Sequence, residues 1–355
     1  MRFPGPVVLL LVSVSIFAAV LAPSEAMRFG SGTLGPALRD AEGRFTNPGG
    51  DSSHGNFGVR FPFFLRRIGG TFRARPGAPI RIDNDGAFLR ANAKRSVATV
   101  TWVGHATLLV QMNQLTFLTD PIWSDKPSPI SFMGPRRFVP PGIALEDLPP
   151  IDFVVISHNH YDHLDLPTLR ALAERRPETR FVVPLGNARL LRKAGVEAVE
   201  ELDWGDSIRI GKLAIHCLPA RHWSKRGVGD DRKALWSSWA IRGPERSFFF
   251  SGDTGYFDGF SRIREAFGSF DLAAVPIGAY EPVKMMQDSH MNPEEAVQAA
   301  LDLDAATALA IHFGTFDLSD EALDEPPRRF LAAATASDLG IDRAWVLQIG
   351  ETREF

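Results

Sequence analysis

The sequence from Val97 onward predicts an α/β domain in which two mixed β-sheets carry helices on their outer faces. The chain has 355 residues, 45% of them apolar and 23% charged, and is therefore long enough to bury a large hydrophobic core. Strand-like and helix-like segments alternate irregularly, with hairpins among them. This order favours two mixed sheets over a regular parallel barrel. No internal repeat of fixed period is evident.

The periodicity of apolar residues places the individual elements. It predicts strands at residues 99–103, 108–112, 115–119, 153–156, 181–183, 213–218, 247–250, 272–276, 309–312 and 345–349. Helices are predicted at residues 166–174 and 187–194, from Asn292 onward, and at 328–339 after Pro326 and Pro327. The helix at Asn292 has a clear start signal, because Pro293 suits the first helical position and Glu295 stands three residues after the cap.

Residues 1–26 differ in kind from the rest of the chain. Arg2 precedes an apolar segment at residues 7–22, and Ser24, Glu25 and Ala26 lie where a signal peptidase would cleave. We therefore expect export, with the mature protein in the periplasm or attached to the outer side of a membrane. An uncleaved anchor is the alternative, but about 16 apolar residues is short for the roughly 20 of a spanning helix.

Residues 27–96 are rich in Gly, Pro, Arg and Phe and predict an extended arm that wraps the domain at 97–355. Residues 52–82 contain no acidic residue, and they interleave six arginines with five phenylalanines: Arg60, Arg66, Arg67, Arg73, Arg75, Arg81, Phe57, Phe61, Phe63, Phe64 and Phe72. One interpretation is a peripheral contact with an anionic lipid surface. The other, which we favour slightly, is a packed arm whose arginines face water.

Charge and cysteine content narrow the classes of function. The net charge of -3 argues against nucleic acid as an electrostatic partner. Cys217 is the only cysteine, which excludes an internal disulfide and a thiolate zinc cluster.

Residues 158–163 hold three of the nine histidines and directly follow the apolar run at 153–156. His158 and His160, two residues apart at a strand end, can point the same way and bind one ion. Asp162 and His163, on the next stretch of turn, can bind a second. A solitary histidine would more often be a core or surface residue, but imidazole and carboxylate groups at this density are typical of a site for zinc or a similar divalent ion.

Further ligands should also lie at strand ends, because a sheet brings those ends together along one edge. His222, Asp253 and His312 each follow a predicted strand. Singly, Asp253 could be a turn residue and either histidine a hydrogen bonder at the edge of the core. Together they complete seven ligands for two ions. One ion would take His158, His160 and His222, the other Asp162, His163 and His312, and Asp253 would bridge them.

The segment 158–163 resembles the H-x-H-x-D-H signature of the metallo-β-lactamase superfamily. Five further segments resemble the branch of phospholipases D that hydrolyse N-acylphosphatidylethanolamine: residues 117–121, 219–226, 235–239, 252–256 and 311–316. The resemblance covers the chain from about Val97 to the C-terminus and is faint before it. It implies an αβ/βα four-layer sandwich with two zinc ions in a groove at the sheet edge.

The same resemblance implies roles for two residues outside the ligand set. Asp120 would lie beside the metals and orient a ligand or the water, although an Asp before Pro121 could be a turn residue. His290 would lie near the active site, where it could contact a substrate phosphate or protonate a leaving group. A capping or surface role is the alternative for His290. His105 is equally well explained as a buried hydrogen bonder, His54 as a solvent-facing residue and His216 as part of the core.

The expected function is zinc-dependent hydrolysis of a phosphodiester, with N-acylphosphatidylethanolamine converted to N-acylethanolamine and phosphatidic acid by a hydroxide that bridges the ions. Hydrolysis of a lactone or another carboxylic ester is a second hypothesis, and a non-enzymatic metal-binding protein of the envelope is a third. Di-iron relatives of this fold carry a carboxylate where this chain has His160, which favours zinc and no flavin partner. The expected partner is a phospholipid or another small ester, and the sequence is compatible with an oligomer.

Overall fold

The computed structural model describes residues 27–28, 34–50, 58–59, 61–63, 66, 77–95, 97–129 and 134–355. The predicted signal segment at 1–26, much of the Arg/Phe-rich stretch and His54 lie outside the described residues. Within the described residues no helix has the length and apolar character needed to cross a membrane.

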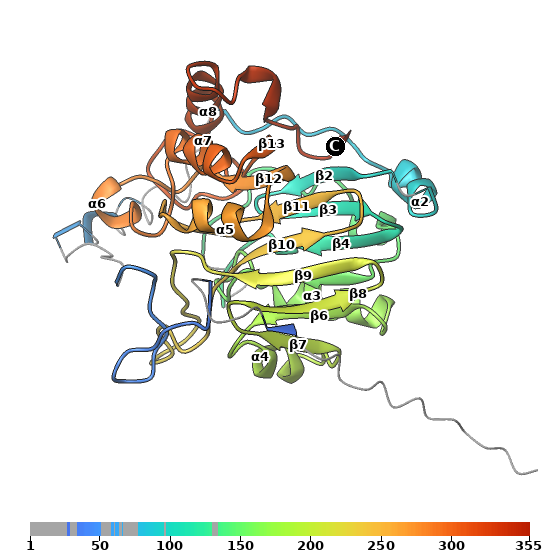
Figure 1. Cartoon of the computed structure of the whole chain (residues 1–355), viewed down its shortest axis with the longest axis horizontal. Helices are drawn as coiled ribbons and strands as arrows, with labels where there is room; N and C mark the ends of the chain where they lie inside the picture. The colour runs from blue at the N-terminus through green and yellow to red at the C-terminus, as the bar shows by residue number, and fades with distance from the viewer. Residues whose placement is uncertain are drawn as a thin grey trace, which may run out of the picture.

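Two mixed β-sheets lie face to face with helices outside them (Figure 1), which confirms the predicted architecture. In the described part of the chain, the strands of one sheet lie in the order β1 (Met27–Arg28), β8 (Asp206–Ile210), β9 (Leu213–Leu218), β10 (Ser238–Arg242), β11 (Ser247–Phe250), β12 (Phe270–Pro276), β13 (Ala305–Ile311) and β14 (Ala344–Trp345). Those of the other lie in the order β15 (Thr352–Glu354), β2 (Thr99–Gly104), β3 (Thr107–Met112), β4 (Leu115–Thr119), β5 (Phe153–Val155), β6 (Arg180–Pro184) and β7 (Val199–Leu202).

The parallel part of each sheet determines where the loops converge. Strands β4, β5, β6 and β7 run parallel in one sheet, and β11, β12, β13 and β14 run parallel in the other. Parallel neighbours direct their carboxyl ends to the same edge, and ligands bind outside such ends in open α/β sheets. The loops that follow β4, β5, β11 and β13 therefore meet.

Helices cover both outer faces of the sandwich (Figure 1). The described helices are α2 (Ala87–Asn92), α3 (Leu166–Arg175), α4 (Ala188–Lys193), α5 (Gly259–Phe267), α6 (Val283–Met286), α7 (Pro293–Asp302) and α8 (Glu325–Thr335), with two 3-10 turns at Leu145–Asp147 and Ile341–Arg343. Helices α3 and α4 pack their apolar residues on the seven-stranded sheet, and α7 packs on β12 and β13. Helix α7 begins with the predicted capping box between Asn292 and Glu295.

Side chains alternate between two apolar clusters along the strands. In β5, Phe153 and Val155 face the core between the sheets, while Val154 belongs to the cluster beneath α3 and α4. This is the two-residue period of a strand buried on both faces. Trp239 of β10 links the two sheets, because its Nε1 donates a hydrogen bond to the carbonyl of Ile156 at 3.1 Å.

The described part of the N-terminal arm packs into this core and carries little regular structure. Leu34 and Phe45 are buried with the core residues between the sheets. Further along the arm, the backbone N–H of Ile82 donates to the carbonyl of Ile349, and that of Ile349 donates to the carbonyl of Ile80. The arm therefore adds main-chain hydrogen bonds to the C-terminal segment.

Several predicted elements have different bounds in the structure: β13, for example, begins at Ala305 and not at Leu309. The strand expected at 345–349 is limited to β14, because Ile349 forms its backbone hydrogen bonds with the arm instead of with a neighbouring sheet strand. Helix α8 begins at Glu325, before both prolines, and ends at Thr335. Pro326 and Pro327 are accommodated because N–H groups in the first turn of a helix have no intrahelical acceptor.

Candidate metal centre

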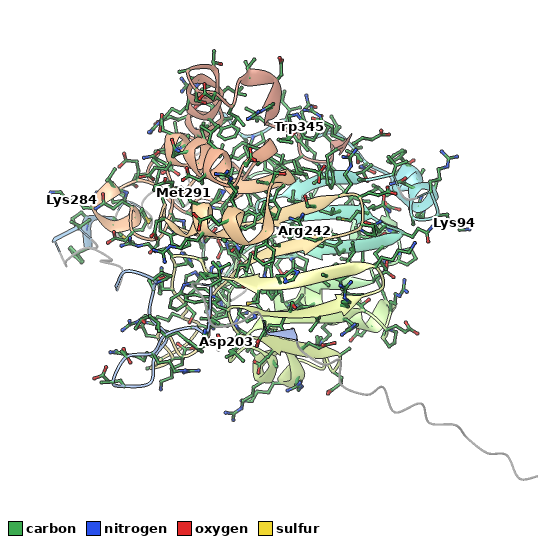
Figure 2. The ribbon with its side chains drawn as sticks, viewed as in Figure 1. Lys94, Asp203, Arg242, Lys284, Met291 and Trp345 are labelled. Carbon is green, nitrogen blue, oxygen red and sulfur yellow. The ribbon has the colours of Figure 1, made fainter. Side chains whose placement is uncertain are left out.

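The seven predicted ligands lie close together, at the ends of strands from both sheets. Figure 2 labels Met291, the residue that follows His290, on the side of the molecule away from Lys94. The seven ligands come from four loops: residues 158–163 after β5, His222 after β9, Asp253 after β11 and His312 after β13. Each loop follows a strand directed to the same edge of the sandwich. The four loops therefore meet at this edge, as predicted. The assignment of each residue as a metal ligand stays a prediction.

Three imidazoles form the first group. His158 Nε2 lies 2.8 Å from His160 Nδ1, and His222 Nε2 lies 3.2 Å from the same atom. His222 Nδ1 donates to the carbonyl of Ser289 at 2.9 Å, and His158 Nδ1 lies 2.9 Å from Ser157 Oγ. These outer contacts orient the two rings with Nε2 directed at the group, as ligand-binding histidines are oriented in metal sites.

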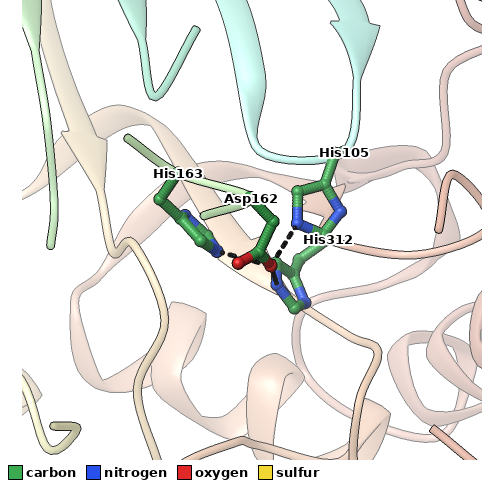
Figure 3. A group of neighbouring side chains, drawn as sticks. All are labelled: His105, Asp162, His163 and His312. Atoms are coloured by element: carbon green, nitrogen blue, oxygen red, sulfur yellow. Dashed lines mark hydrogen bonds and ion pairs between the residues drawn. The ribbon is translucent and has the colours of Figure 1, made fainter. Parts of the chain in front are cut away.

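Asp162, His163 and His312 form the second group (Figure 3). Asp162 Oδ2 lies 3.3 Å from His163 Nε2 and 3.6 Å from His312 Nε2. His163 and His312 are both almost fully buried, whereas the Asp162 side chain is 14% exposed. The carboxylate is therefore the member of this group that water or a substrate can approach.

Asp253 lies between the two groups. Its Oδ2 is 3.2 Å from His163 Nε2 and 3.9 Å from His222 Nε2, and its Oδ1 is 3.1 Å from His312 Nε2. One carboxylate is thus in reach of imidazoles from both groups. This is the position that a bridging ligand requires.

Asp120 is fully buried behind His163. It accepts hydrogen bonds from the backbone N–H of Ser157 at 2.6 Å and from Ser157 Oγ at 2.5 Å, and its Oδ2 lies 2.6 Å from His163 Nδ1. Burial raises the pKa of Asp120, although His163 and Ser157 both lower it. The contact with His163 Nδ1 directs Nε2 of that ring toward Asp162 and Asp253, in agreement with an orienting role.

Two other histidines border the groups. His290 Nδ1 lies 3.8 Å from Asp253 Oδ2, and its side chain is 13% exposed. His105 is buried, and its Nε2 lies 3.0 Å from Asp162 Oδ2. From the sequence, His105 was expected between two strands, but nothing marked it as a neighbour of the metal ligands. His216, predicted as core, is buried in β9.

The electrostatics of the first group and of the carboxylates favour the protonation states that bind cations. Burial lowers the pKa of His158 and His222 well below the ordinary imidazole value and that of His160 to about 4. Burial alone would raise the pKa of Asp162 and Asp253, but the opposing effect of His163 holds both well below their ordinary value. The first group is therefore neutral imidazole, and the carboxylates are ionised. In the second group burial lowers the imidazole pKa, but Asp253 and Asp162 outweigh it: the pKa of His163 is raised well above its ordinary value and that of His312 to about 9, so a bound cation would have to displace a proton from these rings.

The donor set fits divalent cations. Three buried ring nitrogens in or beside the groups have no hydrogen-bond partner in the described structure: His160 Nε2, His290 Nδ1 and His312 Nδ1. Buried polar atoms are normally paired, so such a concentration needs an explanation. The converging ligand atoms within each group lie within 4.8 Å of one another, which suits coordination to a common ion.

Supporting contacts from distant segments hold the ligand loops. Asn47 of the arm donates through Nδ2 to the carbonyl of His222 at 2.8 Å and accepts from the His222 backbone N–H at 2.9 Å. Arg226 donates to the carbonyls of Asn159 and Leu164 at 3.0 and 2.8 Å and lies over the Tyr161 ring. These contacts were not predicted, because no local pattern marks them.

Comparisons with known proteins identify relatives of this chain. A family model described as a beta-lactamase superfamily domain matches residues 116–313. The chain is 44% identical over 238 residues to N-acyl-phosphatidylethanolamine-hydrolyzing phospholipase D 1 of Caenorhabditis elegans, over 64% of this chain and 67% of that protein. It is 34% identical to the mitochondrial N-acyl-phosphatidylethanolamine-hydrolyzing phospholipase D of Saccharomyces cerevisiae, over 72% of this chain and 55% of that protein.

Among solved structures, the metallo hydrolase Igni18 of Ignicoccus hospitalis has a similar fold. Its TM-score is 0.57 at 20% sequence identity, over 73% of this chain and 99% of that one. The matching fold, the matched residues and the shared identity lead to one conclusion: the chain belongs to the metallo-β-lactamase superfamily, in the branch that contains the N-acylphosphatidylethanolamine-hydrolysing phospholipases D.

Proposed function

We propose that the protein is a zinc-dependent phosphodiester hydrolase that converts N-acylphosphatidylethanolamine to N-acylethanolamine and phosphatidic acid. The observation that carries the proposal is the position of Asp253 between two groups of three candidate ligands. The identity to the phospholipase D of Caenorhabditis elegans supports the choice of substrate.

The residues that would hold the ions follow from the geometry. His158, His160 and His222 would bind one zinc ion, Asp162, His163 and His312 would bind the other, and Asp253 would bridge them. When bound, such a pair acidifies water and stabilises negative charge on phosphoryl oxygens. The imidazole at His160, where di-iron relatives carry a carboxylate, supports zinc over iron.

The chain's own residues have separate tasks in the reaction. Water adds to phosphorus, the bond between phosphorus and the ethanolamine oxygen breaks, and N-acylethanolamine leaves with a proton while the phosphate keeps the oxygen of the water. Asp120 keeps His163 in its orientation throughout. His290 borders Asp253, and burial lowers its pKa to about 4, so a neutral ring offers an N–H to an oxygen of the substrate phosphate.

A cleft of about 1010 Å³ opens beside the ligand loop and supports a lipid substrate. Asn159 and Tyr161 of that loop line it, together with apolar side chains such as Leu166 and Leu190. Five cationic side chains line it, Lys126, Arg189, Lys193, Arg226 and Lys233, and they outnumber its three carboxylates, Asp125, Asp165 and Asp230. A volume of this order takes a lipid headgroup with part of its chain, and the cations suit an anionic phosphodiester.

Export is the second part of the proposal. The sequence pattern at residues 1–26 supports an exported protein in the periplasm or on the outer side of a membrane. Export would also place the Arg/Phe-rich stretch on the side of the membrane where the lipid contact, the less favoured interpretation above, would form. Comparison of the N-terminus of the mature protein with the encoded one, by mass spectrometry, tests cleavage after Ala26.

The decisive assay offers the purified protein N-acylphosphatidylethanolamine, ordinary phospholipids and a panel of lactones, with and without a chelator. We expect N-acylethanolamine to be released, and the chelator to abolish its release. Asp253→Asn should lose turnover and bind less zinc, while Asp271→Asn, far from the metal centre, should retain both. Turnover of lactones alone would contradict the phosphodiester assignment, and full activity of Asp253→Asn would refute the bridging role.

A further inference from the structure

We infer that His105 is a positioning residue that holds the carboxylate of Asp162 in place for the second ion. The inference rests on the proposed metal site and adds a residue that lies outside its seven ligands. It assigns no contact between His105 and the substrate.

The backbone of His105 is fixed in an uncommon conformation. His105 has φ 54° in the turn between β2 and β3, a region that residues other than glycine rarely occupy. Its N–H donates to Thr315 Oγ1 at 2.7 Å, and its carbonyl accepts from Trp102 Nε1 at 2.9 Å and from the His312 N–H at 3.0 Å. Strained backbone persists where several contacts enforce it, and it concentrates at functional sites.

The ring of His105 is fixed as firmly as its backbone. It is 1% exposed and lies between the ring of His312, with centroids 4.1 Å apart, and the ring of Phe316, whose centroid is 5.1 Å away in an edge-on arrangement. Figure 3 shows Nε2 of this ring directed at the carboxylate of Asp162, at 3.0 Å. This is the shortest of the three imidazole contacts that Asp162 Oδ2 makes with His105, His163 and His312.

A carboxylate ligand needs such a contact more than an imidazole does. The imidazole planes of His158, His163 and His222 are each oriented by an outer contact through Nδ1. A carboxylate rotates about its terminal bond and has two equivalent oxygens. An N–H from His105 to Oδ2 of Asp162 would stop that rotation and keep the carboxylate facing His163 and His312, as partners behind metal-binding carboxylates do.

His105 could instead be a fourth ligand of the second ion, since its nearest ring nitrogen lies within 4.8 Å of the ligand atoms of Asp162, His163 and His312. The two roles make different demands on a substitute. A positioning residue needs only a donor that reaches Asp162, which the amide of Gln supplies at about the place of Nε2. A ligand needs the imidazole lone pair, which Gln lacks.

The inference is tested by measuring the Zn²⁺ affinity of the full-length protein in competition with a chelator. The variants compared with wild type are His105→Leu, His105→Gln and His105→Asn. We expect wild type to bind two ions, and His105→Leu to bind one of them about 10- to 100-fold more weakly, the usual loss for a partner of a metal ligand. His105→Gln should restore the affinity to within about threefold, and His105→Asn, whose amide is too short, should not. His216→Gln, at a buried histidine of β9 away from the centre, is the matched control and should bind both ions as wild type does.

Each result decides between the possibilities. Wild-type affinity in His105→Leu would overturn the inference, and so would a Gln variant as weak as the Leu variant. If His105→Leu does not fold, as judged by circular dichroism, the comparison of Gln with Asn decides in its place. Failure of the wild type to bind divalent ions would instead refute the proposed function, so the two failures are distinguishable.

Discussion

Replacement of Asp120 by Asn should weaken the second ion without removing any ligand. The substitution changes one buried oxygen to an NH₂ group and keeps the shape of the side chain. Asp120 Oδ2 currently faces two groups, Ser157 Oγ at 2.5 Å and His163 Nδ1 at 2.6 Å, while Oδ1 accepts from the Ser157 N–H. An amide that keeps its oxygen toward the Ser157 N–H places one hydrogen toward His163 Nδ1 and the other toward Ser157 Oγ.

The size of the effect follows from that contact. His163 can avoid the clash only by moving its proton from Nδ1 to Nε2, and a protonated Nε2 cannot bind an ion. A hydrogen bond to a charged group contributes about 1.5–3 kcal/mol. At about 1.4 kcal/mol for each tenfold change in affinity, we expect zinc to bind the second site about 10- to 150-fold more weakly. Turnover should fall with occupancy of that site.

Zinc titration against a competing chelator measures this affinity, and Asp271→Asn is the matched control. Asp271 also accepts from both the N–H and the Oγ of one serine, Ser247, at 2.8 and 2.7 Å, but it lies near the start of β12, away from the metal edge. Asp271→Asn should therefore bind both ions as wild type does. Equal zinc affinity in folded Asp120→Asn and wild type would refute the orienting role of Asp120.

Three further predictions test other parts of the structure. Asn47→Ala should lower the free energy of unfolding by about 3 kcal/mol, because it leaves the buried N–H and carbonyl of His222 unpaired. Urea titration measures this loss, and an unchanged midpoint would show that the arm does not hold this loop. Removal of ions with a chelator should lower the thermal midpoint of unfolding. An ion that binds only the folded state stabilises it by about 2.7 kcal/mol when the free ion concentration is 100 times the dissociation constant. Calorimetry that shows no shift in the midpoint would speak against a bound metal. Trp239→Phe should lose about 1 kcal/mol with its hydrogen bond to Ile156, and a urea midpoint equal to that of wild type would contradict this link between the sheets.

Sequence reasoning succeeded where the signal is local. Alternating residues in β3 and β4, and the start of α7 at Asn292 with its capping box, depend on neighbours within a few positions. The convergence of the candidate ligands was predicted from a general rule, because a sheet brings the ends of its strands together along one edge. His222, Asp253 and His312 needed no knowledge of the fold beyond that rule.

The rest of the site depends on contacts between distant residues. Asn47 lies 175 positions before His222, and His105 lies 57 positions before Asp162. Neither belongs to a pattern that predicts a ligand, and their roles become visible only when the loops are placed together. The short β14 has the same cause, since the partner of Ile349 is in the arm and not in the sheet.

The most direct test of the central claim is anomalous diffraction at the zinc absorption edge from crystals of the full-length protein grown with Zn²⁺. The account predicts two peaks, one among His158, His160 and His222 and one among Asp162, His163 and His312, with the carboxylate of Asp253 between them. Absence of both peaks, or zinc bound only elsewhere on the protein, would contradict it.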